Sequence, residues 1–279
     1  MKVEDTILAV LSDMHTGSST ALFPARGFKA KGRDGNHVSP NAKQTEIHPT
    51  FVRFAGEVAK ARKGKRLIVV HNGDAIDGFH HGSLQESLFQ INDQCAAHVA
   101  LMQEFMRRVG FKRGDELYYV VGTETHVGNS ENDIARELGA VKVDDETYVH
   151  EILELNVNGM THVFAHHGKA RGAGQNEGNS LRNFLRDIRA DREKDGLPPI
   201  DVLWSGHTHG HTYNTHIARK RSDFHVLHGV ICPSWQAKTR YALGKVAMAV
   251  NSIGGVYARV SVDGLMGVPR FVVQTTRDG

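Results

Sequence analysis

The sequence contains little cysteine and no long apolar run at its start. The two cysteines, Cys95 and Cys232, cannot form a disulfide framework or a cysteine-rich zinc site. The apolar run near the amino terminus, Ile7 to Leu11, has five residues, too few for a signal peptide or a membrane span. We therefore expect a cytoplasmic protein with reduced thiols and no membrane partner.

Proline and net charge are also low, whereas histidine is abundant. With 7 prolines, 40% hydrophobic and 23% charged residues, the chain is neither disordered, collagen-like nor a coiled coil. A net charge of +3 is compatible with phosphate-bearing substrates but does not by itself indicate nucleic-acid binding. There are 18 histidines, where an even share of 279 residues among twenty types is about 14 (279/20). Because imidazole is the commonest metal ligand, this excess directs attention to a metal site.

Short apolar runs alternate with helical patterns in the first half of the chain. The runs, which are typical of strands buried on both faces, are Ile7 to Leu11, Leu67 to Val70, Leu117 to Val121 and Val202 to Trp204. Apolar residues three or four apart predict helices over 49–62, 84–109 and 179–194. We expect the first of these helices to begin at Pro49, a residue favoured in the first turn.

The second half of the chain is rich in predicted strands. The pairs Asn158-Gly159 and Gly254-Gly255 predict hairpin turns between them. The pattern therefore predicts an α/β fold in which two mixed sheets pack face to face and helices flank both. We expect a single domain over 1–279, with a surface insertion loop at 17–48.

Polar clusters follow five of the apolar runs directly. They are Ser12 to His15, Asn72 to Asp77, Gly122 to His126, His166 to Gly168 and Gly206 to His209. Open α/β sheets place their functional sites on the loops beyond the carboxyl ends of strands. We therefore expect these five clusters to converge at one edge of the fold.

The residue types in these clusters are those of a transition-metal site. Asp13-x-His15 and His207-x-His209 each place two metal-binding groups on one side of an extended chain. Carboxylate oxygen mixed with imidazole nitrogen suits Mn, Fe, Zn or Co. Two such pairs and a shared carboxylate can hold two ions roughly 3.5–4 Å apart, the arrangement used for in-line displacement at phosphorus.

The order of these motifs resembles that of the calcineurin-like metallophosphoesterases. Their signature is Asp-x-His, Gly-Asp-x-x-Asp, Gly-Asn-His with an acidic residue, His, and Gly-His-x-His. The matches here lie within residues 12–210, and the strings SDMHTGS and SWQAKTRYA also resemble phage-encoded members. The resemblance implies a four-layer α/β/β/α sandwich with a dinuclear metal centre, which activates a bridging hydroxide for in-line attack on a phosphate ester.

The resemblance also implies a role for each matching residue. The first metal would be bound by Asp13, His15 and His209, the second by His167 and His207, and both by Asp74. His126 matches the general acid that protonates the leaving oxygen, and Asp77 matches the carboxylate that orients this histidine. Of the adjacent pair, His167 is preferred as the ligand because it precedes Gly168, which leaves His166 a core or supporting position.

The third motif departs from the family because it contains no Asn before His126. Glu124 is the preferred substitute as ligand of the second metal, since a carboxylate is a stronger oxygen ligand than a neutral hydroxyl. Thr125, directly before His126, and Asn129 are the alternatives.

The sequence therefore predicts a metal-dependent hydrolase of phosphate esters with two divalent ions. Manganese is preferred, and Fe, Zn, Co and Ni are alternatives. Basic loops favour a phosphodiesterase or nuclease acting on DNA, RNA or nucleotides; their basic residues are Arg26, Lys29, Lys31, Arg33, Lys169, Arg171, Arg219, Lys220, Arg221, Lys238 and Arg240. The alternatives are a phosphomonoesterase acting on phosphoproteins or small molecules, and a non-catalytic metal-binding scaffold.

Overall fold

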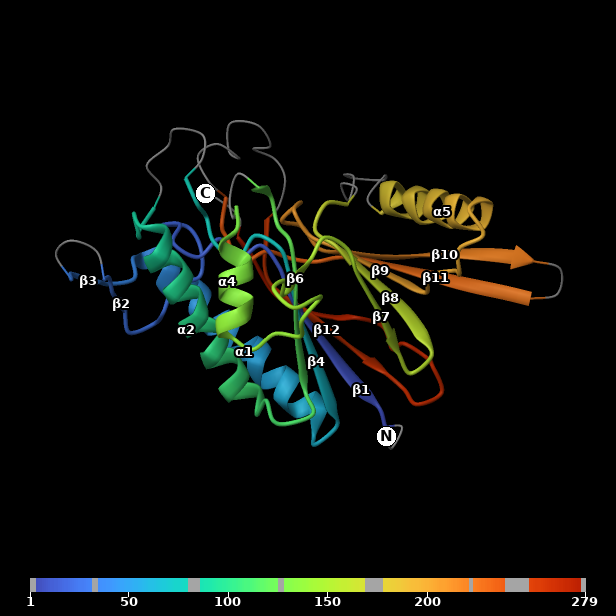
Figure 1. The fold of residues 1–279 in the computed structure, drawn as a ribbon, viewed down its shortest axis with the longest axis horizontal. Helices are drawn as coiled ribbons and strands as arrows, with labels where there is room; N and C mark the ends of the chain where they lie inside the picture. Colours follow the sequence, from blue (N-terminus) through green and yellow to red (C-terminus); the bar gives the residue numbers. More distant parts are fainter. Residues whose placement is uncertain are drawn as a thin grey trace.

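The structure, a computed structural model, describes residues 4–31, 35–79, 86–124, 128–168, 178–220, 223–238 and 251–276. Two sheets lie face to face in it (Figure 1). The first sheet has six strands, in the order β13 (Arg270–Thr276), β12 (Asn251–Val260), β1 (Thr6–Leu11), β4 (Arg66–Asn72), β5 (Glu116–Val120) and β6 (Val149–His150). The second has five, in the order β10 (Thr212–Lys220), β11 (Asp223–Ile231), β9 (Val202–Ser205), β8 (Met160–Ala165) and β7 (Leu153–Val157).

Helices form the two outer layers. The outer face of the first sheet is covered by α1 (Ala42–Arg62), α2 (Ile91–Val109) and α4 (Ser130–Glu137), and that of the second by α5 (Asn179–Lys194) (Figure 1). The short strands β2 (Phe28–Lys29) and β3 (His37–Val38) form a separate pair. The four-layer α/β/β/α fold predicted from the sequence is confirmed. No helix in the described part of the chain is both long and apolar enough to span a membrane.

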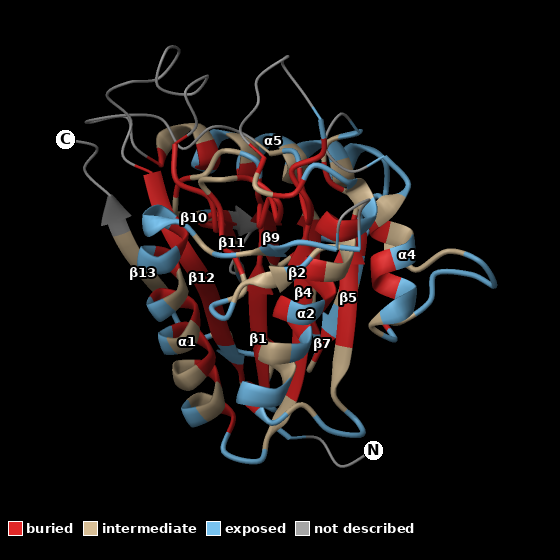
Figure 2. Ribbon diagram, turned by 90° about the vertical axis from the view of Figure 1, so that its left-hand side faces the viewer, coloured by how far each residue is buried: buried red, intermediate tan, exposed pale blue. Residues whose placement is uncertain are grey.

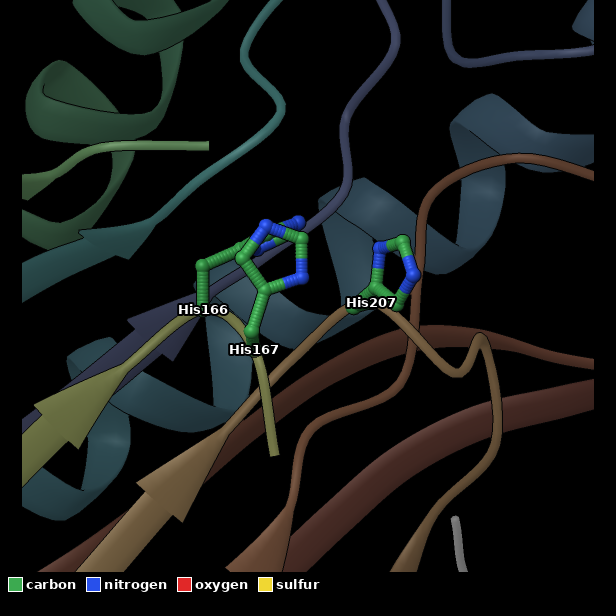
Figure 3. A group of neighbouring side chains, drawn as sticks. All are labelled: His166, His167 and His207. Atoms are coloured by element: carbon green, nitrogen blue, oxygen red, sulfur yellow. The ribbon is translucent and has the colours of Figure 1, made fainter. Parts of the chain in front are cut away.

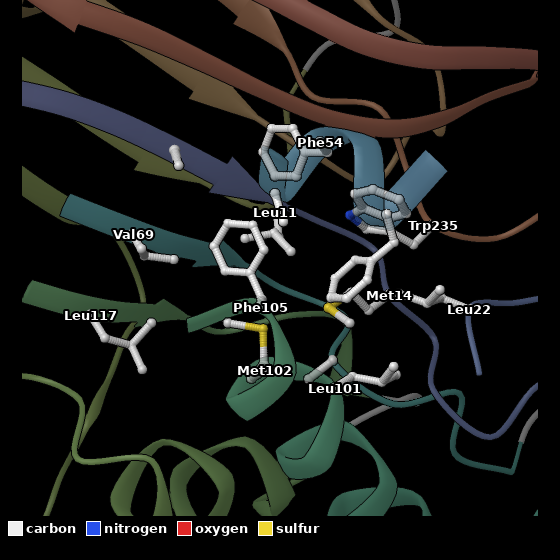
Figure 4. Packing of buried hydrophobic residues seen from close by; sticks show 14 of the residues in the cluster. Leu11, Met14, Leu22, Phe54, Val69, Leu101, Met102, Phe105, Leu117 and Trp235 are labelled. Carbon is white, nitrogen blue, oxygen red and sulfur yellow. The ribbon is translucent and has the colours of Figure 1, made fainter. Parts of the chain in front are cut away.

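Three apolar cores fill the spaces between the four layers. Phe54, Phe105 and Trp235 pack between the first sheet and its helices (Figure 4). Val10 and Trp204 pack between the two sheets. Leu181, Leu185, Leu203 and Leu227 join α5 to the second sheet. Because both faces of the central strands are covered, these strands are buried along most of their length (Figure 2).

Parallel pairing brings the predicted polar clusters to one edge of the fold. In the first sheet β1, β4 and β5 are parallel, and in the second β8 is parallel to β9. Beyond the strands the loops stay paired, because the Asp13 N–H donates to the Gly73 carbonyl (2.9 Å) and the Gly206 N–H to the His166 carbonyl (3.0 Å). The carboxyl ends of both sheets therefore meet at the polar clusters.

The expected surface loop at 17–48 and the expected helix start at Pro49 both need correction. Helix α1 begins at Ala42, where Asn41 and Gln44 form a capping box, and Pro49 lies inside the helix. Within the supposed loop, Leu22 and Phe23 are fully buried. The polar composition of this segment conceals a packed connection and two turns of helix.

Two other predicted boundaries also differ. Helix α2 begins at Ile91 rather than at 84. The hairpin at Asn158-Gly159 is confirmed, but strand β12 continues through Gly254 and Gly255. A side chain on Gly255 would collide with Phe54 of α1, and one on Gly254 with the backbone of β13. The glycine pair serves close packing rather than a turn.

Candidate metal centre

Three groups of potential metal ligands lie at the carboxyl ends of the strands. Within each group the ligand atoms lie within 4.8 Å of one another. The first, here the inner cluster, contains Asp13, His15 and His209; the second, the outer cluster, contains His166, His167 and His207; the third, the linking group, contains Asp13, Asp74 and His166. Six of the seven metal ligands predicted from the sequence are therefore brought together.

Asp74 lies between the inner and outer clusters. Its Oδ2 is 3.6 Å from His15 Nε2 and 3.1 Å from His166 Nε2. Its Oδ1 accepts a hydrogen bond of 2.6 Å from the Thr123 N–H, which fixes the orientation of the carboxylate. One oxygen atom thus faces ligands of both clusters, a position that suits a carboxylate shared between them.

Backbone and side-chain donors also hold Asp13 in place. The His207 N–H donates to its two oxygens at 3.0 and 3.1 Å, and the Ser12 hydroxyl donates to Oδ2. Burial alone would raise the pKa of Asp13, but the charge on His166 and the hydrogen bond from His209 lower it to about 2. Asp13 is therefore a carboxylate at neutral pH, the form that binds a cation.

His166 is the site residue that sequence reasoning placed elsewhere. It is buried, and its Nδ1 lies 2.8 Å from the Asn72 carbonyl while its Nε2 faces Asp74. Burial lowers its pKa, but Asp13 and Asp74 together raise it to about 10. His166 and His167 both lie beyond the end of β8, and their rings approach His207 (Figure 3). The alternation of a strand does not apply there, so both adjacent histidines reach the site.

Asp77 contacts a ligand of the inner cluster. Its Oδ1 lies 3.2 Å from His15 Nδ1 and accepts a hydrogen bond from Gln236 Nε2 at 3.1 Å. Burial lowers the pKa of His15, but Asp77 and Asp74 outweigh this effect and raise it. A carboxylate on the far nitrogen fixes the ring of a metal-binding histidine. The predicted partner of Asp77, His126, lies outside the described residues, so its role as general acid stays a prediction.

The backbone at the site is strained. Seven described residues other than glycine have positive φ, and five of them are predicted metal ligands: Asp13, His15, Asp74, His207 and His209. For a residue other than glycine, this left-handed conformation costs about 1–2 kcal/mol of stability, because the Cβ atom lies too close to the following carbonyl oxygen. Such strain is concentrated at functional sites, where the surrounding structure maintains it.

Two positions next to the ligands must be glycine because other segments of the chain pass close to them. A Cβ on Gly73 would collide with the ring of His166, and one on Gly122 with the backbone of Asp74. Only glycine permits the loops after β4, β5 and β8 to approach so closely.

Glu131 of α4 connects two of these loops. Its carboxylate accepts the Ala75 N–H at 3.0 Å and the Gly122 N–H at 2.7 Å, and it is 1% exposed. Burial raises the pKa of Glu131 to about 7, although the two N–H donors act in the opposite direction. The sequence does not point to this residue, because nothing in a helical segment shows that its glutamate accepts hydrogen bonds from two distant loops.

The third motif is arranged differently from the prediction. Glu124 is exposed, and none of the three ligand groups found among the described residues contains it. Asn129 is exposed as well and directly precedes α4, while Thr125 lies outside the described residues. Among the described residues of this motif, Thr123 has a side chain that faces the clusters, and its Oγ1 lies 3.3 Å from Asp74 Oδ2.

Comparisons with known proteins identify distant structural similarities only. No protein-family model and no curated protein matches the sequence. Among solved structures, the Haemophilus influenzae NAD nucleotidase NadN is 13% identical, with 97% of this chain and 50% of that chain covered and a TM-score of 0.41. A dimetal phosphatase from Danio rerio is 9% identical, with coverages of 97% and 98% and a TM-score of 0.40. PhoD is 10% identical, with coverages of 100% and 73% and a TM-score of 0.43.

The chain thus spans about half the length of NadN. At these identities the similarities concern the course of the chain alone, and function has to be inferred from the chain's own residues.

Proposed function

We propose that this protein is a metal-dependent hydrolase of phosphate esters whose site holds two divalent cations. The observation that carries the proposal is the position of Asp74 between two clusters of three ligands each. The donor set fits such cations, since His15 Nε2 and His209 Nε2 converge to 3.2 Å. Two neutral imidazoles at this distance have at most one hydrogen atom between these nitrogens, so at least one nitrogen presents a lone pair that can bind a cation. Mixed carboxylate and imidazole donors favour manganese, with Fe, Zn, Co and Ni as alternatives.

Each group of residues has a distinct task in this proposal. The inner cluster would hold one cation and the outer cluster the other, and Asp74, which faces ligands of both clusters, would be shared between them. Two bound cations supply the charge that activates water and polarises a phosphoryl oxygen. Asp77 keeps Nε2 of His15 directed into the site by holding its Nδ1. His126 is proposed to protonate the leaving oxygen.

For the substrate, we favour nucleic acid or a nucleotide. Helix α5 carries Arg182, Arg186 and Arg189 at spacings of four and three, so they share one face. All three lie close enough to His216 on β10 that, in addition to burial, their charges lower its pKa. Strand β10 begins three residues after His209, and its Asn214 Nδ2 donates to the carbonyl of Gly178, which directly precedes α5. Arg186 and Arg189 also pair with Asp187 and Glu193 on the same helix. Because such surface ion pairs are weak, the arginines remain able to contact a phosphate backbone.

The reaction and the substrate are tested in one set of assays with Mn²⁺. A bis-aryl phosphodiester, an aryl phosphomonoester, a cyclic nucleotide and single-stranded DNA would be compared. We expect hydrolysis of the diester and of DNA. In the double variant Arg182→Glu/Arg186→Glu, we expect KM for DNA to rise and its salt dependence to weaken, with the aryl diester unaffected. Faster cleavage of the monoester than of either diester would instead favour a phosphomonoesterase.

A non-catalytic metal-binding scaffold is the second alternative. The burial of Asp77 against His15 does not distinguish it from an enzyme, because a structural metal site also needs oriented ligands. The assays do distinguish them. If the protein binds two ions but hydrolyses none of the four substrates with any of the divalent metals, the result contradicts the enzyme proposal.

A further inference from the structure

Thr123 occupies the place in the fold where the resembled family has its Asn. It directly follows Gly122 at the end of β5, as the family Asn follows a Gly. Counting back from His126 leads instead to Thr125, because this chain has two additional residues between the two ends of the motif. The structure therefore relates the motif to the family from its glycine rather than from its histidine.

The hydroxyl of Thr123 faces three ligands at nearly equal distances. Its Oγ1 lies 3.3 Å from Asp74 Oδ2, 3.4 Å from His166 Nε2 and 3.4 Å from His207 Nδ1. These distances are longer than an ordinary hydrogen bond made by a hydroxyl, which is about 2.7–2.8 Å. A hydroxyl has one proton and cannot donate to all three. The oxygen thus lies together with one carboxylate oxygen and two imidazole nitrogens, which are the kinds of atom that bind divalent cations.

The backbone holds this hydroxyl in place on both sides. The Thr123 N–H donates to Asp74 Oδ1 at 2.6 Å, and the preceding Gly122 N–H donates to Glu131 Oε2 at 2.7 Å. Glu131 also accepts from Ala75, the residue after Asp74. Thr123 and Asp74 are therefore positioned relative to each other by three hydrogen bonds, and an oriented ligand loses little freedom on binding a cation.

We propose that Thr123 Oγ1 is the oxygen ligand of the cation held by the outer cluster. This inference rests on the proposed dinuclear function and replaces Glu124 as the ligand. A threonine hydroxyl is an established type of ligand for divalent cations, as in the phosphate-binding loops of nucleotide hydrolases. Because the hydroxyl is neutral, it leaves the outer cation with more net positive charge than Glu124 would, which strengthens the attraction for a phosphate ester.

Titration calorimetry of the metal-free protein with Mn²⁺, without substrate, tests the inference. The substitution Thr123→Val keeps the shape of the side chain and removes the oxygen. We expect it to weaken the outer cation by at least about tenfold, because even partners of metal ligands contribute 10–100-fold to affinity. The inner cation should bind unchanged. Thr123→Ser and Thr123→Asn, which retain an oxygen donor, should keep two strong sites.

The matched controls are Glu124→Ala and the thermal unfolding of each metal-free variant. Unchanged binding of both ions by Thr123→Val would overturn the inference, as would loss of the outer ion in Glu124→Ala instead. If Thr123→Val unfolds, Thr123→Ala and Thr123→Ser repeat the comparison, and equal outer-ion affinity in these two would again overturn it. A wild-type protein that binds fewer than two ions contradicts the proposed function itself, before any variant is compared.

Discussion

The inner and outer clusters differ in burial, although both contain three potential ligands. In the inner cluster Asp13 and His15 are buried and His209 is half-buried; in the outer cluster only His166 is buried, while His167 and His207 are exposed. The inner cluster draws its residues from both sheets, whereas all three residues of the outer cluster follow strands of the second sheet. For the proposed dinuclear centre, this difference predicts that the inner cation is retained and that the outer cation exchanges and meets the substrate.

The largest effect is expected from Asp74→Asn, which removes the carboxylate shared by both clusters. Metal content should fall to one ion or fewer. Hydrolysis of the aryl diester should fall by at least about a thousandfold, since metal ions supply several kcal/mol of transition-state stabilisation and 1.36 kcal/mol is tenfold in rate. Metal analysis and steady-state kinetics check both. Asp93→Asn, which alters another buried carboxylate that belongs to none of the three ligand groups, is the control. Two ions and full activity in Asp74→Asn would contradict the bridging role.

Paired substitutions in the two clusters test whether burial determines how fast each cation is released. A chelator should remove one ion rapidly and the other slowly from the wild type. We expect His207→Ala to eliminate the rapidly released ion and His209→Ala the slowly released one, each with a loss of affinity of about 10–100-fold. Stopped-flow measurement with a chromophoric chelator checks this. Equal release rates in the wild type would show that burial does not separate the two cations.

A smaller effect separates the adjacent histidines of the outer cluster. Both His166→Ala and His167→Ala should weaken the outer cation, the first by about tenfold more, because water cannot easily replace a buried imidazole. Calorimetry with Mn²⁺ measures the two affinities. A larger loss in His167→Ala would favour the assignment made from the sequence, in which His167 is the ligand.

The smallest effect is expected from Glu131→Gln, because it acts on the clusters through backbone hydrogen bonds. An amide has one acceptor oxygen where the carboxyl group has two, so one of the two buried N–H groups loses its acceptor, at a cost of about 1–3 kcal/mol of stability. The outer cation should weaken by less than about tenfold. Thermal unfolding of the metal-free protein and calorimetry measure these changes.

The pH dependence of unfolding is a control for the Glu131 substitution. Burial raises the pKa of Glu131 from 4.5 to about 7 in the folded state. The resulting stability is complete below about pH 4.5 and is lost as the pH rises through about 7. Glu131→Gln should lack this loss; an unchanged pH profile would show that Glu131 does not titrate in this range.

The layers and most of the clusters could be predicted from the sequence because they follow from local patterns. Buried parallel strands read as continuous apolar runs, and polar residues at their ends must converge once the strands are parallel. The correct prediction of α5 follows from Leu181 and Leu185 on one face. Helix α1 was predicted too short because its first seven residues, from Ala42, are mainly polar and Pro49 resembles a start signal.

The remaining errors concern contacts between distant segments. No local pattern shows that Gly255 packs against Phe54, that Thr123 faces His207, or that Glu131 accepts from Ala75. The sequence shows which residues follow a strand but not how each loop turns after it ends. His166 and His167 illustrate this, since strict alternation would have directed one of them away.

The left-handed backbone at five ligand positions sets stability against function. Glycine at any one of them would relieve about 1–2 kcal/mol of strain. The greater freedom that glycine gives the unfolded chain would offset part of this gain. The fold thus holds Asp13, His15, Asp74, His207 and His209 in a conformation that costs stability, as is common where side chains are arranged for binding rather than for packing.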